Sequence, residues 1–265
     1  MNSWDWTLIA VVSVMGTAVA YLRNPEHKAF VLMLPVPFTL AVLTLDRPVS
    51  ATHVLAMLPS FAFTIGVWAL HVRLRWPILA AIVFCALAYC ALGISVERSL
   101  PASEGIFWMA AAFTFTTSFL LILTLPYRSE PHHRSPLPVW IKLPAIALVV
   151  FFLVAIKQRL GGFMTMFPMV GVVAAYEARN CLWALVRRFP WLMLLMTPMM
   201  VLIHLTQAHV GQGWALALGW LLHLLLLWLL RNRYGRGALP LPFAGEEISP
   251  GNFQRSFPGF RKEEE

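Results

Sequence analysis

The chain has 265 residues, of which 59% are apolar and only 12% are charged, and its mean hydropathy is +0.72. Soluble domains average about 25% charged residues, so this chain lacks the charge needed to coat a water-exposed surface, and we expect an integral membrane protein. The net charge of +8 does not indicate nucleic-acid binding, because the basic residues lie in short loops between apolar segments and not along one soluble face.

The N-terminal segment differs from a cleavable signal peptide. Trp4 and Asp5 stand where a basic region would precede the apolar run, and no small-residue cleavage site follows. The sequence therefore predicts that this segment remains as a first membrane span. The three cysteines, at positions 85, 90 and 181, lie in or beside apolar segments without metal-binding spacing, so we interpret them as small core residues.

A helix that crosses a bilayer needs about 20 mostly apolar residues. By this criterion the sequence predicts nine spans, near residues 6–22, 29–46, 51–71, 76–96, 105–126, 139–157, 162–178, 189–208 and 213–231. Most connections are short, so neighbouring spans should pack antiparallel. The longest connection, residues 127–138, divides the chain into two unequal parts.

The charges in the connections predict the orientation. Four basic residues (Arg47, Arg98, Lys157 and Arg159) fall on the side shared by the N-terminus and the even-numbered loops, and thirteen fall on the other side up to Arg236. Because Lys and Arg are retained in the cytoplasm, we expect an inner (plasma) membrane protein with its N-terminus outside and its C-terminus in the cytoplasm. Residues 235–265 are rich in Pro, Gly and charge, and we expect a disordered cytoplasmic tail.

A proline motif occurs twice. Phe30, Met33 and Pro35 form a Phe-x-x-Met-x-Pro pattern, which recurs 133 residues later at positions 163, 166 and 168. Each copy puts a proline about two turns inside an apolar segment, where it removes a backbone donor and opens the helix. At the same offset the first four predicted spans overlie the last four, and the identities also include Ala41/Ala174, Thr64/Thr197, His71/His204 and Arg98/Arg231.

The odd fifth span would make the second copy enter the membrane from the opposite face. We therefore expect an all-α fold of nine transmembrane helices in two inverted four-helix repeats, with residues 1–104 as the first repeat, 105–138 as a linker helix and loop, 139–234 as the second repeat and 235–265 as the tail. Inverted repeats place solute or ion sites near mid-membrane, often at interrupted helices. Predicted spans two and seven are the candidates.

The second half of the chain carries a family resemblance. Between residues 143 and 188, an apolar span is followed by Lys157, Gly161-Gly162, Met166-Phe167-Pro168, Ala174 and Tyr176. In this combination the stretch resembles the GlpM-like family of small four-helix inner-membrane proteins. The resemblance implies an origin by duplication of a four-helix unit, and it carries over no biochemical activity.

The leading hypothesis is a transporter or channel-like permease for a small solute or ion, with its site between spans two and seven. The expected substrate path comprises Phe30, Pro35, Phe163, Phe167, Pro168, Tyr176, Glu177 and His204. The alternative is a non-catalytic membrane subunit that assists an envelope or respiratory complex, and a lipid-modifying enzyme is a third option. Expected partners are membrane lipids and a second copy or a membrane complex, and no nucleic acid.

Two ionisable residues could supply the polar group. His204 lies late in span eight. It either forms a hydrogen bond between helices near the outer interface, or it serves as a proton-coupled or solute-binding group, since histidine titrates near physiological pH. Glu177 ends span seven and is either paired with Arg187 or Arg188, or directed inward to serve a proton or cation path. The sequence leaves both alternatives open.

Enzyme and cofactor chemistry finds little support in the sequence. His204 and His209 are five residues apart and diverge by about 140° around a helix, unlike the i, i+4 pair of a zinc helix. Nucleophile motifs, paired catalytic carboxylates, phosphate loops and dinucleotide turns are absent. We therefore expect no metal and no cofactor, and the sequence favours a non-enzymatic function.

Overall fold

The computed structural model describes residues 2–21, 31, 33–101, 103–126 and 139–234, and every regular element in these ranges is helical. Phe30 and the predicted tail lie outside the described residues. The elements are α1 (Ser3–Tyr21), α3 (Val36–Leu45), α4 (Ala51–Leu55), α5 (Met57–Trp68), η1 (Ala69–Arg73), α6 (Ile78–Ser99), α7 (Glu104–Thr124), α8 (Val139–Ala155), α9 (Lys157–Leu160), η2 (Gly161–Met166), α10 (Met169–Glu177), α11 (Leu182–Val210) and α12 (Gln212–Tyr234).

Five helical segments are long and apolar enough to cross a membrane. They are Ala51–Arg73, Ile78–Ser99, Glu104–Thr124, Leu182–Val210 and Gln212–Leu230. A sixth span results if Leu143–Ala155 and Lys157–Met166, which meet at a bend of 67°, are taken together. The helical membrane protein that the composition predicts is thus consistent with the fold, whereas the count of nine spans stays a prediction. The eighth predicted span begins at Leu182, seven residues earlier than its apolar pattern indicated.

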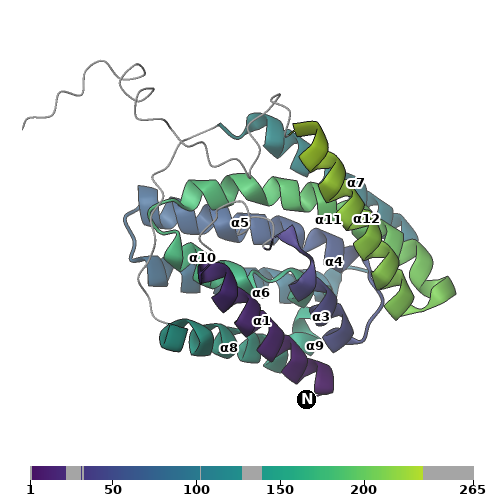
Figure 1. Ribbon diagram of the computed structural model, residues 1–265, viewed down its shortest axis with the longest axis horizontal. Helices are drawn as coiled ribbons and strands as arrows, with labels where there is room; N and C mark the ends of the chain where they lie inside the picture. The colour runs from purple at the N-terminus through teal and green to yellow at the C-terminus, as the bar shows by residue number, and fades with distance from the viewer. Residues whose placement is uncertain (1, 22–30, 32, 102, 127–138, 235–265) are drawn as a thin grey trace, which may run out of the picture.

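The helices form an inner pair and an outer set (Figure 1). α5 and α11 run side by side through the middle, α1 packs against α8 on one side of them, and α7 and α12 pack against α11 on the other. The outer helices expose large apolar side chains, such as Leu87 on α6, Met109 on α7 and Leu221 on α12. An apolar exterior of this kind is suited to lipid, which offers no hydrogen bonds to polar groups.

Both copies of the proline motif interrupt their segments. α3 begins at Val36, directly after Pro35, and α10 begins at Met169, directly after Pro168. Proline is tolerated at the start of a helix, where its missing N–H has no partner to lose. α3 has 10 residues and α10 has 9, so each is only about 15 Å long, half of a bilayer core of about 30 Å.

The glycine pair before the second motif permits a close approach of chain segments. Gly161 has a φ of +53°, and a Cβ there would overlap the carboxylate of Glu97 on α6. A Cβ on Gly162 would lie 2.7 Å from the backbone nitrogen of His53. Only glycine at position 162 lets η2 lie this close to the start of α4, so this residue serves close packing.

We expect Gly162→Ala to lower the free energy of unfolding by about 1–3 kcal/mol, because the backbone at His53 must move away from the new methyl group. The matched control is Gly213→Ala on α12, where a Cβ would meet nothing within 4 Å and should be neutral or slightly stabilising. Thermal unfolding of the purified protein in one detergent measures both. Equal effects of the two changes would contradict the packing argument.

Candidate functional site

Backbone carbonyls beside the two breaks accept hydrogen bonds from side chains of neighbouring helices. Tyr89 on α6 donates its hydroxyl to the carbonyl oxygen of Phe163 at 2.7 Å, and Ser60 on α5 donates to the carbonyl of Met166. His223 on α12 lies with Nε2 at 2.9 Å from the carbonyl oxygen of Met33. Since an unsatisfied backbone group inside hydrocarbon costs several kcal/mol, these side chains make the interruptions tolerable.

A cavity of about 190 Å³ lies between the two interrupted segments. Its walls come from α3, α5, the η2–α10 segment and α11, and both motif prolines line it together with Phe167. Most of the other wall residues are apolar, including Phe38, Phe63, Phe189 and four methionines. The cavity therefore lies between predicted spans two and seven, the place that the sequence suggests for a solute site.

Three lining residues carry polar side chains, namely Thr64, Thr165 and Arg188. The hydroxyl of Thr64 donates to the carbonyl of Ser60 at 3.0 Å, and that of Thr165 donates to the carbonyl of Gly162 at 2.7 Å. Arg188 is partly buried, and no carboxylate or other hydrogen-bond acceptor among the described residues is paired with its guanidinium. Among the described residues that line this cavity, Arg188 is thus the charged one.

The residues of the expected path divide into two groups. Pro35, Phe167 and Pro168 line the cavity. Phe163 is buried behind it, and its ring packs edge-on against Tyr89 with centroids 6.5 Å apart. Tyr176 lies toward the end of α10, where the guanidinium of Arg179 is 5.4 Å from the centre of its ring.

Glu177 and His204 lie away from the cavity wall. Glu177 is buried at the last residue of α10. His204 is sixteen residues after Arg188 on α11, which places it about 24 Å farther along the helix axis. The structure therefore does not bring either group together with the prolines, and it supplies Arg188 as the charged group at the cavity.

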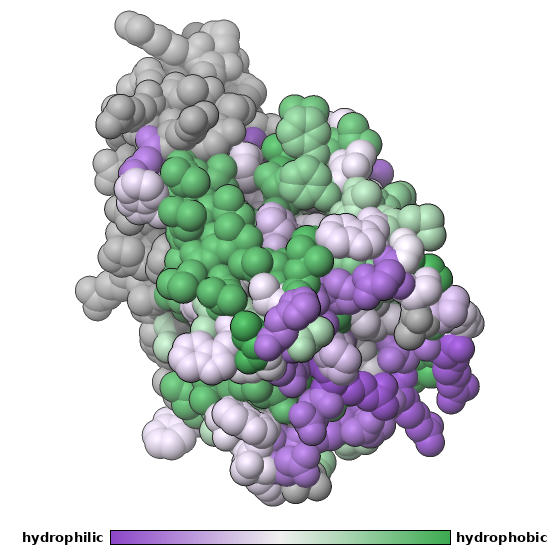
Figure 2. Space-filling model, turned by 90° about the vertical axis from the view of Figure 1, so that its right-hand side faces the viewer, coloured by the Kyte–Doolittle hydropathy of each residue, from purple (hydrophilic) through white to green (hydrophobic). Residues whose placement is uncertain are grey.

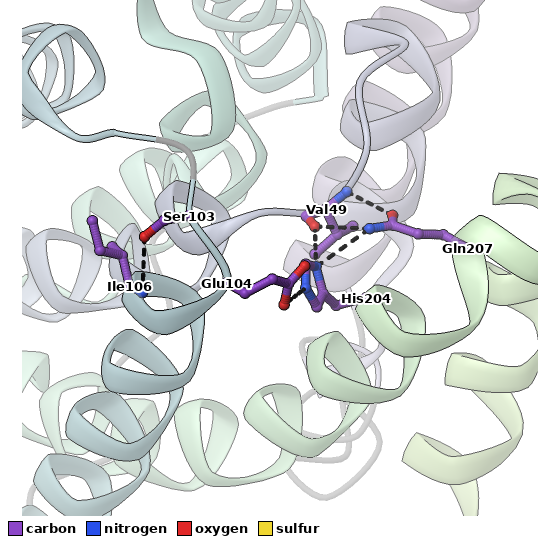
Figure 3. Close-up of polar contacts among 6 residues, drawn as sticks. All are labelled: Val49, Ser103, Glu104, Ile106, His204 and Gln207. Atoms are coloured by element: carbon purple, nitrogen blue, oxygen red, sulfur yellow. Dashed lines mark hydrogen bonds and ion pairs between the residues drawn. The ribbon is translucent and has the colours of Figure 1, made fainter.

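His204 ties three segments together at its own end of the molecule (Figure 3). Its Nδ1 lies 2.8 Å from the carbonyl oxygen of Val49, its Nε2 lies 3.1 Å from Oε2 of Glu104, and its ring stacks on Phe107 at 3.6 Å. Gln207 holds Val49 from both sides, accepting its N–H at 2.8 Å and donating to its carbonyl at 3.0 Å. Of the two alternatives for His204, this geometry matches the hydrogen bond between helices.

The same end of the molecule holds a buried ion pair. Lys157 on α9 donates to Oδ1 of Asp5 at 2.6 Å and to the carbonyl of Thr44 at 3.2 Å, and Asp5 is fully buried. The hydroxyl of Thr44 in turn donates to the carbonyl of Trp4 at 3.1 Å. The pair therefore joins α1, the end of α3 and the bend between α8 and α9. Sequence reasoning did not pair these residues, which are 152 positions apart.

Figure 2 faces the end of the molecule that carries the connection from α3 to α4, and hydrophilic residues gather on this face. Asp46 and Arg47 are exposed on this connection, and Arg98 near the end of α6 and Arg159 on α9 are exposed as well. Apolar residues cover the neighbouring part of the same view. This polar end is suited to water, while the apolar flanks are suited to lipid.

Searches among protein-family models, curated proteins and solved structures find no match to this chain. Within the described residues, no group of three or more His, Cys, Asp or Glu side chains is arranged to hold a metal ion.

Removing the buried carboxylate charge should destabilise the fold. We expect Asp5→Asn to lower the free energy of unfolding by about 3 kcal/mol, because Lys157 is left without its buried counterion. Arg47→Gln is the control, since Arg47 and Glu97 lie 3.7 Å apart with the arginine side chain 48% exposed, and such a pair is worth less than about 1 kcal/mol. Chemical denaturation in mixed micelles measures both, and an equal loss in the two variants would refute a structural role for the buried pair.

The hydroxyl of Tyr89, which bonds the carbonyl of Phe163 at the second break, can be removed while the aromatic ring is kept. Tyr89→Phe keeps the edge-on packing against Phe167, whose centroid is 5.1 Å away, and leaves the carbonyl of Phe163 without this donor. We expect a loss of about 0.5–2 kcal/mol in stability and faster labelling of a cysteine placed at Thr165 beside the break. Unchanged labelling and stability would mean that the hydroxyl does not support the interruption.

Proposed function

We propose that this protein is a permease of the inner membrane that moves a small solute or ion through the cavity between predicted spans two and seven. The observation that carries the proposal is that two half-length helices, α3 and α10, each begin at a motif proline, and both prolines line one cavity. Interrupted helices that meet at mid-membrane are the usual construction of a transport site, because they let a path cross the membrane without an unbroken helix in its way.

We further propose nine spans in two inverted four-helix repeats, with the N-terminus outside and the C-terminus in the cytoplasm. The starts of α3 and α10 are 133 residues apart, at Val36 and Met169. Elements that correspond at this offset pack against each other, as α1 does with α8, and α5 with α11. The two helices that supply these caps also correspond at this offset, because Tyr89 on α6 serves one break and His223 on α12 serves the other. These features support a duplicated four-helix unit, which the GlpM-like resemblance also implies.

A second candidate is a membrane subunit that assists a larger complex. An apolar groove on the outer surface between α7, α11 and α12 favours it, since the groove contains Ala111, Ala112 and Thr197, and small residues let a neighbouring helix approach closely. In this alternative the cavity would serve packing or lipid binding and not passage of a solute.

Transport predicts a selective effect of the second motif proline. Liposomes that contain the purified protein are preloaded with a mixture of small organic acids, amines, sugars and inorganic ions, and the released solutes are measured by mass spectrometry. We expect at least one solute to leave faster than from empty liposomes, and Pro168→Ala to slow its release about tenfold, which corresponds to about 1.4 kcal/mol, because the half-helix loses its fixed start.

Pro198→Ala is the matched control for this experiment. Pro198 lies inside α11 and lines the outer groove instead of the cavity, so its replacement should leave the release rate within about twofold of the unmodified protein. If no solute is released faster than from empty liposomes, or if both proline variants behave alike, transport through this cavity is ruled out in favour of the subunit.

A further inference from the structure

The chemistry of the cavity wall narrows the class of solute. We infer that the cavity binds an amphiphilic organic anion, with a carboxylate or phosphate monoester at Arg188 and an alkyl or aromatic body among the apolar wall residues. This inference rests on the proposed function in that it takes the cavity between the interrupted segments as the solute site. It goes further by naming the charge and the shape of what enters.

The first argument is the charge of Arg188. A guanidinium stays protonated in proteins, so its charge cannot be removed by loss of a proton when it is withdrawn from water. Placing such a charge in a membrane protein costs several kcal/mol unless an anion or a set of acceptors compensates it. Arg188 lines the cavity without a paired carboxylate among the described residues. An anionic ligand supplies the missing partner, and a planar acid group can accept two parallel hydrogen bonds from a guanidinium.

The second argument is that other polar groups at the cavity are already engaged. The hydroxyls of Thr64 and Thr165 donate to carbonyls of their own segments. The carbonyls of Met33 and Met166, next to the two breaks, are bonded by His223 and Ser60. A cation would need such carbonyl oxygens as ligands, and a sugar would need several donors and acceptors. The wall thus disfavours cations and polyols and leaves one charged donor for the ligand.

The third argument is the size and polarity of the remaining space. An engineered apolar cavity of about 150 Å³ accommodates benzene and stays free of water. The volume here is about 190 Å³, which suits an aromatic ring or a short run of methylene groups. Phe38, Phe189 and Met196 are among the side chains that such a body would contact. One acid group on one apolar body is the ligand that fits both ends of this site.

The experiment uses the full chain in nanodiscs of phosphatidylcholine, with octanoate, octan-1-ol and octylamine as probes in isothermal titration calorimetry. The three probes share one chain length and differ in charge. We expect octanoate to bind most tightly, and Arg188→Gln to weaken octanoate at least about tenfold while leaving octan-1-ol unchanged. Arg187→Gln is the control, because it removes a neighbouring positive charge that does not line the cavity, and octanoate affinity should change less than about threefold.

A second variant tests the apolar part of the site. Ala174→Leu adds three carbons to a lining residue and should weaken octanoate and octan-1-ol together. Octanoate binding that Arg188→Gln leaves intact, or octylamine binding as tight as that of octanoate, would overturn the inference. Competition identifies the source of the natural ligand, since displacement of octanoate by oleate and not by benzoate points to a bilayer lipid, and the reverse points to an acid from water.

The outcomes separate this inference from transport itself. Octanoate binding that depends on Arg188, without faster release of any solute from liposomes, would sustain the anion site and exclude the permease. Release of another solute that depends on Pro168, without octanoate binding, would sustain the permease and exclude the anion site.

Discussion

The structure depends on one constraint, which is that a polypeptide inside hydrocarbon must satisfy every backbone carbonyl it exposes. A continuous helix does this by itself, but segments broken at Pro35 and Pro168 cannot. Carbonyls beside the breaks, those of Met33, Phe163 and Met166, accept hydrogen bonds from His223, Tyr89 and Ser60. α5, α6 and α12 therefore do more than surround the interrupted segments, because each contributes a polar side chain that bonds a backbone carbonyl at a break.

Close packing and a buried charge pair hold the neighbouring segments in place. η2 reaches the start of α4 because residue 162 lacks a Cβ, and residue 161, which also lacks one, lies against Glu97 on α6. Beside it, Lys157 and Asp5 fix α9 to α1 and to the end of α3. His204 and Gln207 attach the segment before α4 to α11. These polar contacts lie at one end of the molecule. They hold the segments around the cavity in place from that end, while most of the cavity wall is apolar.

The described residues that line the cavity are mostly apolar, and Arg188 is the charged one among them. Together they decide which kind of ligand the cavity can bind. Because hydroxyls and carbonyls around it are bonded within the protein, the wall offers a ligand little beyond dispersion contacts and the charge of Arg188. Such a wall discriminates by sign of charge and by apolar shape more than by a pattern of hydrogen bonds. That property distinguishes it from a site for sugars or metal cations, and it holds whether the ligand is transported or retained.

Composition and local sequence pattern are enough to predict a helical membrane protein and the places where its helices break. Low charge and long apolar runs predict membrane helices, and the repeated proline motif predicts interruptions at Pro35 and Pro168, because both are local properties of composition and backbone geometry. Tertiary structure decided the partners. Asp5 and Lys157, or His204 and Glu104, come from distant segments with no shared local pattern, and His204, which the sequence singled out for the path, joins helices instead of lining the cavity. In the sequence Arg188 is one of many basic residues near a span end, and the packing of α11 against the two interrupted segments places it in the wall of the cavity.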